Sequence, residues 1–197
     1  MGVKESETVL KRCHWCSNDP AYILYHDYEW GVPVHDDQHL FEMLILEGAQ
    51  AGLSWITILR KRDAYREAFY NFEVDKVAAF TEQDVNRLML NAGIVRNRLK
   101  ISAAIQNARC VLQLLAEGTS LSEFLWSFAA NQPIVNQGLA HHEIPTQTDQ
   151  SVAMSRALKK RGFKFVGPTI CYAFMQAVGM VNDHEPSCFL YAGPLER

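Results

Sequence analysis

The sequence lacks any run of apolar residues long enough to span a membrane. Its first twelve residues, MGVKESETVLKR, also lack the apolar core of a signal peptide, and because they are polar we expect a flexible tail over 1–12. Neither sign of charge dominates: the net charge is −3, so any binding to nucleic acid must come from a local patch. These absences favour a cytoplasmic protein that binds no membrane.

Cysteines are few, and strand patterns are missing altogether. The 197 residues include five cysteines, which in the cytoplasm are thiols or metal ligands instead of disulfides. No segment alternates as a strand does, and no internal repeat is visible. With 48% hydrophobic residues, 13–197 suits one globular unit or two closely packed helical lobes. The predicted fold class is all-α, built from many short helices.

The most informative stretch of the chain is 158–188. Its basic residues stand before and inside a short turn: Lys160, Arg161 and Lys164. Gly162 and Gly167 bracket this turn, and Pro168 suits the first turn of a following helix. The pattern predicts helix, hairpin and helix over about 158–179, with free amides and cations that suit a nucleic-acid phosphate. The residues alone favour the alternative, a turn between packed helices with a solvated basic face, because glycine-rich turns and basic runs are both common.

Five possible metal ligands lie near the two ends of the chain: Cys13, Cys16, His26, His184 and Cys188. The first two have the common C-x₂-C spacing, and the last two are four residues apart. A tetrahedral site needs four of these five groups and would staple the N-terminus to the C-terminus. The alternative is a set of buried free thiols and unrelated histidines.

A helix that begins at Asp19–Pro20 places aromatic and polar side chains together. Tyr22, Tyr25, His26 and Glu29 follow at i, i+3, i+4 and i+7 and therefore share one face. This face suits a lined cavity better than a plain core.

The next helix, capped by Asp36 or Asp37, carries Glu47 in line with its apolar Leu40–Leu44 stripe. A carboxylate on a core-facing stripe costs free energy unless it has a partner. The alternative is a helix-end glutamate that reaches water. The sequence AGLSW then breaks the helix, and we expect Ser54 to cap a helix that bears Trp55.

Several further elements follow from local patterns. Thr81 and Asp84 resemble a capping box that opens a helix ending near Asn91. A long helix is predicted over about 95–117. The stretch 131–148 has no clear period and is predicted to be a loop.

Longer stretches resemble known families. The segment FVGPTICYAFMQAVG resembles the hairpin of the helix-hairpin-helix DNA glycosylases, and GIVRNRLKISAAIQNA resembles the preceding helix. CHWCSNDPAYILYHDYEWGVP, LEGAQAGLSWITILRKR and RALKKRGFKFVGPTICYAFMQAVGMVNDH are similar to the bacterial 3-methyladenine DNA glycosylase I family. The resemblance implies a zinc ion bound by Cys13, His26, His184 and Cys188, with Cys16 as an extra thiol outside the family pattern.

The activity that the resemblance implies is base-excision repair. The enzyme would flip 3-methyladenine out of double-stranded alkylated DNA and hydrolyse its N-glycosidic bond. Methylation at N3 makes the base cationic, and aromatic faces and a carboxylate attract a cation. The implied base pocket consists of Tyr22, Tyr25, Trp55 and Glu47, with Trp15 as a candidate further wall. The alternative for each ring is ordinary core packing.

Contacts with DNA follow from the same resemblance. Leu53, after the flexible Gly52, is the candidate wedge for the gap left by the flipped base; the alternative is a core residue. The hairpin residues expected to contact DNA are Lys160, Arg161, Lys164, Gly167 and Thr169. Bifunctional members have a lysine just after the hairpin glycine. Pro168 and Thr169 stand there in this chain, which predicts no Schiff base and no strand cleavage.

Asp183 is a second candidate catalytic carboxylate. Most members of the superfamily have an aspartate beyond the second hairpin helix, but Asp183 follows Gly179 at a shorter gap and directly precedes His184. It could instead cap a turn or orient His184. Two other functions stay open: a non-catalytic zinc-containing DNA-binding module, and a broader glycosylase that also removes 7-methylguanine. Glu47 suits the amine of adenine better than the O6 acceptor of guanine. A monomer is the default.

Overall fold

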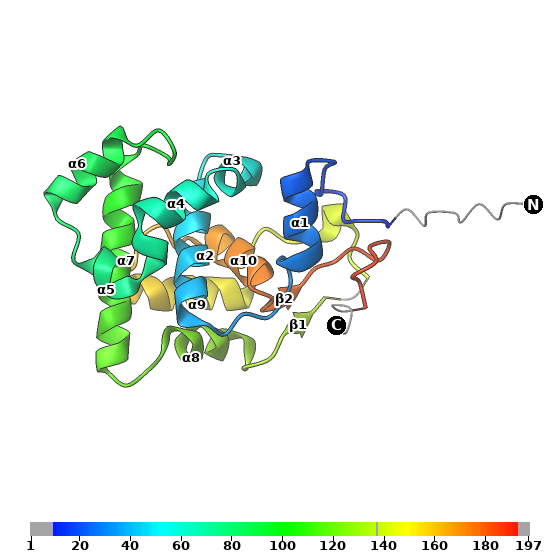
Figure 1. The fold of residues 1–197 in the computed structure, drawn as a ribbon. Coiled ribbons are helices and arrows are strands. Elements are labelled where there is room, and N and C mark those ends of the chain that lie inside the picture. Colours follow the sequence, from blue (N-terminus) through cyan, green and yellow to red (C-terminus); the bar gives the residue numbers. More distant parts are fainter. Residues whose placement is uncertain (1–9, 137, 193–197) are drawn as a thin grey trace, which may run out of the picture.

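The computed structural model describes residues 10–136 and 138–192, and this part of the chain is mostly helical, as predicted (Figure 1). The α-helices are α1 (Pro20–Tyr28), α2 (Asp37–Gln50), α3 (Trp55–Leu59), α4 (Arg62–Ala68), α5 (Val74–Ala78), α6 (Glu82–Leu90), α7 (Arg98–Ala116), α8 (Leu121–Trp126), α9 (Asp149–Lys160) and α10 (Pro168–Ala177). The short elements are η1 (Tyr70–Phe72), η2 (Ser127–Ala129), η3 (His141–Glu143), β1 (Ile134–Val135) and β2 (Val181–Asn182). Among the described helices, none combines the length and the hydropathy that a membrane span needs.

Local capping chemistry sets where most of the helices begin. The carboxylate of Asp19 accepts a hydrogen bond from the amide of Ala21 at the start of α1, and Asp36 caps α2 in the same way. The capping box of Thr81 and Asp84 is present at α6, as predicted. These helix starts were visible in the sequence because a cap acts within three residues of itself.

Three expectations need correction. The long helix begins at Arg98 instead of about residue 95, because the side chain of Asn97 caps its first turn. Ser54 precedes α3, but its hydroxyl bonds the hydroxyl of Thr57 at 2.8 Å and caps no amide. The expected loop over 131–148 contains η3 and also β1, which pairs in parallel with β2. A local pattern cannot reveal a partner strand more than forty residues away.

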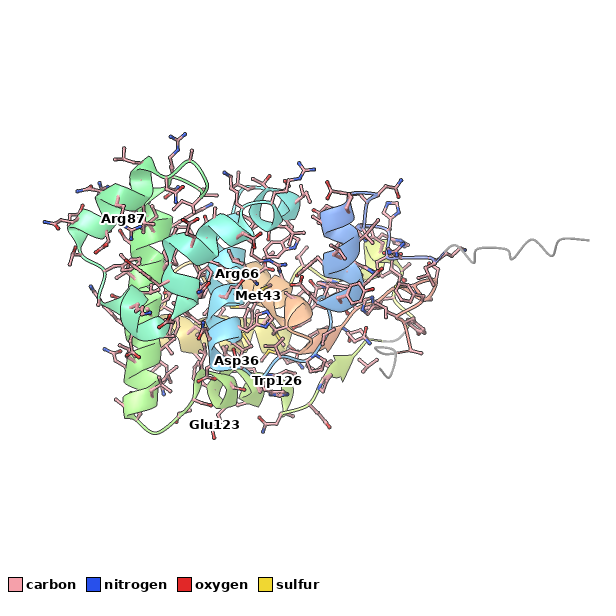
Figure 2. All side chains as sticks on the ribbon, viewed as in Figure 1. Asp36, Met43, Arg66, Arg87, Glu123 and Trp126 are labelled. Carbon is pink, nitrogen blue, oxygen red and sulfur yellow. The ribbon has the colours of Figure 1, made fainter. Side chains whose placement is uncertain are left out.

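Helix α2 lies at the centre of the molecule. In Figure 1, α5, α6 and α7 form one end, α1 and both ends of the described chain lie at the other, and α2, α9 and α10 lie between them. Every residue of α2 from Leu40 to Ala49 is buried. Figure 2 shows Met43 of this helix in the interior, below Arg66 of α4. Arg66 donates a hydrogen bond to the buried carboxylate of Glu42 at 2.9 Å, so this acid on α2 is partnered.

The segment between α9 and α10 is a tight turn fixed against α7. Gly162 has φ +93°, which favours glycine. The amide side chain of Asn107 on α7 donates to the carbonyl of Lys164 at 3.0 Å and accepts from its N–H at 2.8 Å. Phe163 and Val166 are buried. The turn therefore holds a defined shape between the two helices.

The start of the chain is less detached than expected. Residues 1–9 of the predicted tail lie outside the described residues. From there on, the carbonyl of Lys11 accepts the N–H of Phe189, and Arg12 forms an ion pair with Asp27. The two ends of the described chain are therefore joined before the first helix begins.

Candidate functional site

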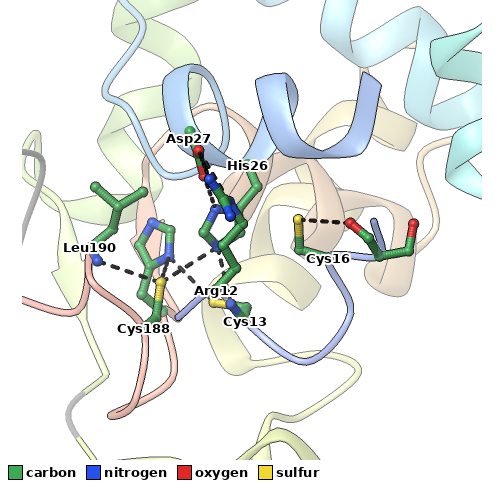
Figure 3. Close-up of polar contacts among 9 residues, drawn as sticks. Arg12, Cys13, Cys16, His26, Asp27, Cys188 and Leu190 are labelled. Carbon is green, nitrogen blue, oxygen red and sulfur yellow. Dashed lines mark hydrogen bonds and ion pairs between the residues drawn. The ribbon is translucent and has the colours of Figure 1, made fainter. Parts of the chain in front are cut away.

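Four predicted metal ligands, Cys13, His26, His184 and Cys188, lie together in the fold. Cys13 and His184, which are in contact, are 171 positions apart in the sequence. The sulfur of Cys13 lies 3.4 Å from Nδ1 of His184, and the sulfur of Cys188 lies 3.6 Å from that nitrogen and 3.5 Å from Nε2 of His26. All four ligand atoms lie within 4.8 Å of one another and all four residues are buried. Figure 3 shows Cys13, His26 and Cys188 converging from three parts of the chain.

These distances suit a tetrahedral metal site. With metal–sulfur and metal–nitrogen bonds of the usual length for zinc, tetrahedral geometry places sulfur and nitrogen roughly 3.6 Å apart. The hydrogen bond from Cys13 and those from the two histidines lower the pKa of Cys188 against the effect of burial, so this sulfur readily becomes a thiolate ligand. The cluster could hold a metal ion, and two thiolates with two imidazoles are a donor set that zinc accepts.

A second layer of contacts supports the cluster. Nδ1 of His26 lies 2.8 Å from the carboxylate of Asp27, which leaves Nε2 to face the cluster. Arg12 in turn donates three hydrogen bonds to this carboxylate, at 2.8, 3.1 and 2.6 Å. Cys16 points elsewhere: its sulfur lies 3.7 Å from the carbonyl of Ser17, away from the converging ligands (Figure 3). Of the two cysteines in the C-x₂-C pair, the structure therefore places only Cys13 in the cluster.

Next to the cluster lies an aromatic cleft with a volume of about 590 Å³, within the range of small-molecule sites. All five predicted base-pocket residues line it: Trp15, Tyr22, Tyr25, Glu47 and Trp55. It is also lined by Trp30, Gln50, Ser54, His141, Ile144, Ala173 and Gln176, none of which was predicted. Gln50 could have been found, because it follows Glu47 by three positions on the same helix. Most of the other lining residues come from segments distant in sequence, and no local pattern predicts that those segments pack against the cleft.

Trp15 is the centre of the aromatic walls. Its ring centroid lies 5.7 Å from that of Tyr22, 6.2 Å from Tyr25 and 5.0 Å from Trp30. It also lies 5.3 Å from the ring of His26, so the cleft and the metal cluster share a wall. Closing the cluster therefore also positions the rings of the cleft.

Glu47 is the unusual group in this cleft. It is only 4% exposed, and among the described residues its carboxylate has no hydrogen-bond partner. Burial raises its pKa to about 8. Burial and the nearby Glu47 also raise the pKa of Tyr25, whose phenol therefore stays neutral. An unpartnered carboxylate walled by rings can stabilise a cation that enters the cleft.

Further polar groups in the cleft are also unsatisfied. The indole N–H groups of Trp15 and Trp55 are buried and have no partner in the described part of the chain. The hydroxyl of Tyr22, in contrast, accepts the N–H of Ile56 at 3.1 Å, which ties α1 to α3. The predicted face of α1 therefore divides among three sites: its tyrosines line the cleft, His26 belongs to the metal cluster, and Glu29 forms an ion pair with Arg62.

Asp183 does not line the cleft. It is 2% exposed, and its carboxylate accepts hydrogen bonds from Tyr172 at 2.6 Å and from Gln176 and Asn136 at 2.7 Å each. The alternative that it orients His184 is not supported, because no hydrogen bond joins the two side chains in the described residues. The N–H of His184 instead donates to the side-chain oxygen of Asn182 at 3.1 Å. Asp183 instead holds Gln176, which does line the cleft.

The predicted wedge residue lies in the exposed turn between α2 and α3. Leu53 is 41% exposed in the turn between α2 and α3, so the alternative that it is a core residue is wrong. Gly52 beside it has φ +79° and open space around it. Lys100 of α7 fixes this turn, because its ammonium group donates to the carbonyls of Ala49 and Ala51 at 2.7 and 2.6 Å.

The hairpin presents fewer free cations than the sequence indicates. Lys160, Lys164 and Thr169 are exposed, and a side chain added at Gly167 would meet no neighbour. Arg161, however, pairs with Glu117 at 2.8 Å and lies over the ring of Phe124. Its charge is therefore partly neutralised by residues distant in sequence.

Comparisons with known proteins identify the family of this chain. The family model described as methyladenine glycosylase matches residues 15–191. DNA-3-methyladenine glycosylase 1 of Escherichia coli (strain K12) is 58% identical over 184 residues, which cover 93% of this chain and 98% of that protein. A crystal structure of 3-methyladenine DNA glycosylase I is 56% identical, has a TM-score of 0.90, and covers 91% of this chain and 98% of its own.

A second solved structure concerns the ligand. It is a variant of 3-methyladenine DNA glycosylase I in complex with 3-methyladenine, 41% identical with a TM-score of 0.86, covering 90% of this chain and 96% of its own. The family match includes every residue that lines the cleft and, of the Cys/His cluster, His26, His184 and Cys188. The chain belongs to the methyladenine glycosylase family.

Proposed function

We propose that this chain is a DNA repair glycosylase that removes 3-methyladenine from alkylated double-stranded DNA by hydrolysing the N-glycosidic bond. The observation that carries the proposal is the buried, unpartnered Glu47 among the rings of the cleft. Family membership and the named activity of the relatives support the same substrate. Glu47 therefore has the role of recognising the base and favouring its cationic form.

Charge explains why the alkylated base would be selected. In an empty cleft at pH 7 the carboxyl group of Glu47 keeps its proton, because its pKa is about 8. A base made cationic by methylation supplies the missing counter-charge and favours the ionised carboxylate. Normal adenine is neutral and supplies none. The aromatic walls add attraction for the cationic ring, so binding discriminates by charge as well as by shape.

The reaction needs little acid catalysis. The C1′–N9 bond breaks, its electron pair neutralises the cationic base, and water adds its oxygen to C1′ and releases a proton. Glu47, Tyr25 and Trp55 would hold the base in the cleft while the bond breaks. Asp183 is too fully engaged by its three donors to act directly on the sugar, so we assign it no chemical step.

A stacked base cannot reach a cleft of this kind, so the proposal includes base flipping. Leu53 would enter the gap in the duplex, since it is exposed next to Gln50 and Ser54 at the cleft. The helix-hairpin-helix arrangement of α9 and α10 would contact the DNA backbone through Lys160 and Lys164 and through the residues Gly167 and Thr169. Arg161 would contribute less, because Glu117 already pairs with it.

The proposed enzyme contains a metal ion, lacks lyase activity and is monomeric. One structural zinc ion would be held by Cys13, His26, His184 and Cys188 and would stabilise the folded chain. Pro168 and Thr169 stand where a lyase would need its lysine, so we propose a monofunctional enzyme. We also propose that it acts as a monomer in the cytoplasm.

The test is an excision assay on a methylated duplex with chromatography of the released bases. We expect free 3-methyladenine, no strand cleavage, and a large loss of release in Glu47→Gln. The matched control is Glu67→Gln, the same change at an exposed residue of α4. Absence of any released base from the unmodified protein would favour the non-catalytic DNA-binding module. Release of 7-methylguanine at a comparable rate would favour the broader alkylpurine glycosylase.

A further inference from the structure

Gln176 on α10 contributes a polar side chain to the cleft that the charge argument does not use. It lines the same cleft as Glu47, and its Nε2 donates to Asp183 at 2.7 Å. Its amide oxygen has no hydrogen-bond partner in the described part of the chain. A glutamine at this place can present either a donor or an acceptor to a ligand, depending on how the amide is turned.

Asp183 decides that orientation. A carboxylate only accepts hydrogen bonds, so the NH₂ group of Gln176 must face it and the amide oxygen is left for the cleft. The opposite orientation would place two acceptors against each other. Tyr172 strengthens the arrangement: burial and the Asp183 carboxylate raise its pKa, so it keeps its proton and donates to the same Oδ2 at 2.6 Å. Asn136 occupies the other oxygen.

The acceptors that the cleft offers therefore include the carboxylate of Glu47 and the amide oxygen of Gln176. A 6-aminopurine carries two N–H bonds on its exocyclic amine, whereas a 6-oxopurine carries an acceptor at that position. A buried site arranged for donors rejects a ligand that brings an acceptor, because both groups are then left unpaired.

We infer that the amide oxygen of Gln176, held in place by Asp183, accepts a hydrogen bond from the exocyclic amine of the bound base and selects 6-amino over 6-oxo purines. Gln176 is then a specificity-determining residue, and Asp183 is a positioning residue that acts through it. This inference rests on the proposed function, since it concerns the same cleft. It also assigns Asp183 a reason for its burial other than catalysis.

The test compares the binding of two free bases, 3-methyladenine and 3-methylhypoxanthine, which differ at position 6. Binding is followed by the fluorescence of the tryptophans in the cleft. In Gln176→Met we expect the preference for 3-methyladenine to fall about ten-fold, as for the loss of one buried hydrogen bond. An unchanged ratio of affinities in this variant would overturn the inference, even if DNA excision is impaired.

Two further variants test the positioning role. Asp183→Ala should lower the ratio as far as Gln176→Met does, and the double variant should lower it no further, because both remove one interaction. Tyr172→Phe removes another partner of Asp183 but leaves Gln176 bound, so its ratio should equal that of the unmodified protein. A ratio lowered equally by Tyr172→Phe would overturn the role of Asp183, because general loosening would then explain the effect.

The binding assay also separates this inference from the proposed function. If the unmodified protein binds 3-methyladenine selectively but releases none from DNA, the proposed glycosylase activity fails while the inference stands. If it releases 3-methyladenine from DNA but Gln176→Met keeps full selectivity, the inference fails while the activity stands.

Discussion

Replacing Glu47 by glutamine should stabilise the protein while it impairs function. The carboxyl group has a pKa of about 8 in the folded chain and an ordinary value of 4.5 when exposed. Between these values the folded state holds a proton that the unfolded state lacks, so the stability of the unmodified protein falls as pH rises through this window. Glutamine is neutral throughout and avoids this loss.

The magnitude follows from the two pKa values. If glutamine matches the protonated acid, Glu47→Gln gains about 1 kcal/mol at pH 5.5, about 3 kcal/mol at pH 7 and about 5 kcal/mol at pH 8.5. Urea unfolding of both proteins at the three pH values measures the difference, and other titrating groups cancel in it. Glu67→Gln, at an exposed position, should change stability little at any pH.

The result that would refute this reasoning is a parallel pair of stability curves. If the free energies of unfolding of the unmodified protein and Glu47→Gln differ by the same amount at pH 5.5 and 8.5, the acid is not held neutral by burial. Its role as an unsatisfied partner for a cationic base would then lose its physical basis.

Four other predictions follow from the site. Excision of 3-methyladenine at low substrate concentration should increase as pH rises through about 8 and level off above about pH 9, because Glu47 must lose its proton as the cationic base binds; the rates of Glu47→Gln should lack this rise. Cys188→Ser should abolish metal retention, measured by elemental analysis, and lower stability by more than about 3 kcal/mol, whereas Cys16→Ser should change neither. Leu53→Ala should reduce excision from duplex DNA about ten-fold or more but leave the binding of free base unchanged. Lys100→Met should loosen the turn that carries the leucine, costing about 2 kcal/mol of stability in urea unfolding and lowering duplex excision with free-base binding intact.

Some of the site was accessible from local sequence. Helix starts such as Asp19 and Thr81 could be predicted because a cap and the amides it satisfies are neighbours in the chain. The resemblance named the four metal ligands and the rings around Glu47, and the structure brings each of these groups together. Spacing alone left five candidate ligands for a four-coordinate metal site. The structure excludes Cys16, because its side chain points away from the other four.

Other features depend on contacts between distant segments, which no local pattern encodes. Glu42 and Glu47 both lie buried on α2, yet Glu42 pairs with Arg66 of α4 and Glu47 has no hydrogen-bond partner among the described residues. Likewise Arg161 forms an ion pair with Glu117, which lies at the C-terminal end of α7, and its charge is partly neutralised.

The sequence by itself determined that the chain is helical, where most helices begin and which side chains are chemically suited to a metal and a cationic base. Those properties arise from residue type and from spacing within a few positions. The tertiary structure alone decided that Glu47 is desolvated with no hydrogen-bond partner in residues 10–136 and 138–192, and that Asp183 faces Gln176 instead of His184. Burial and hydrogen-bond pairing depend on what the rest of the chain places around a group, so they exist only once the helices have packed.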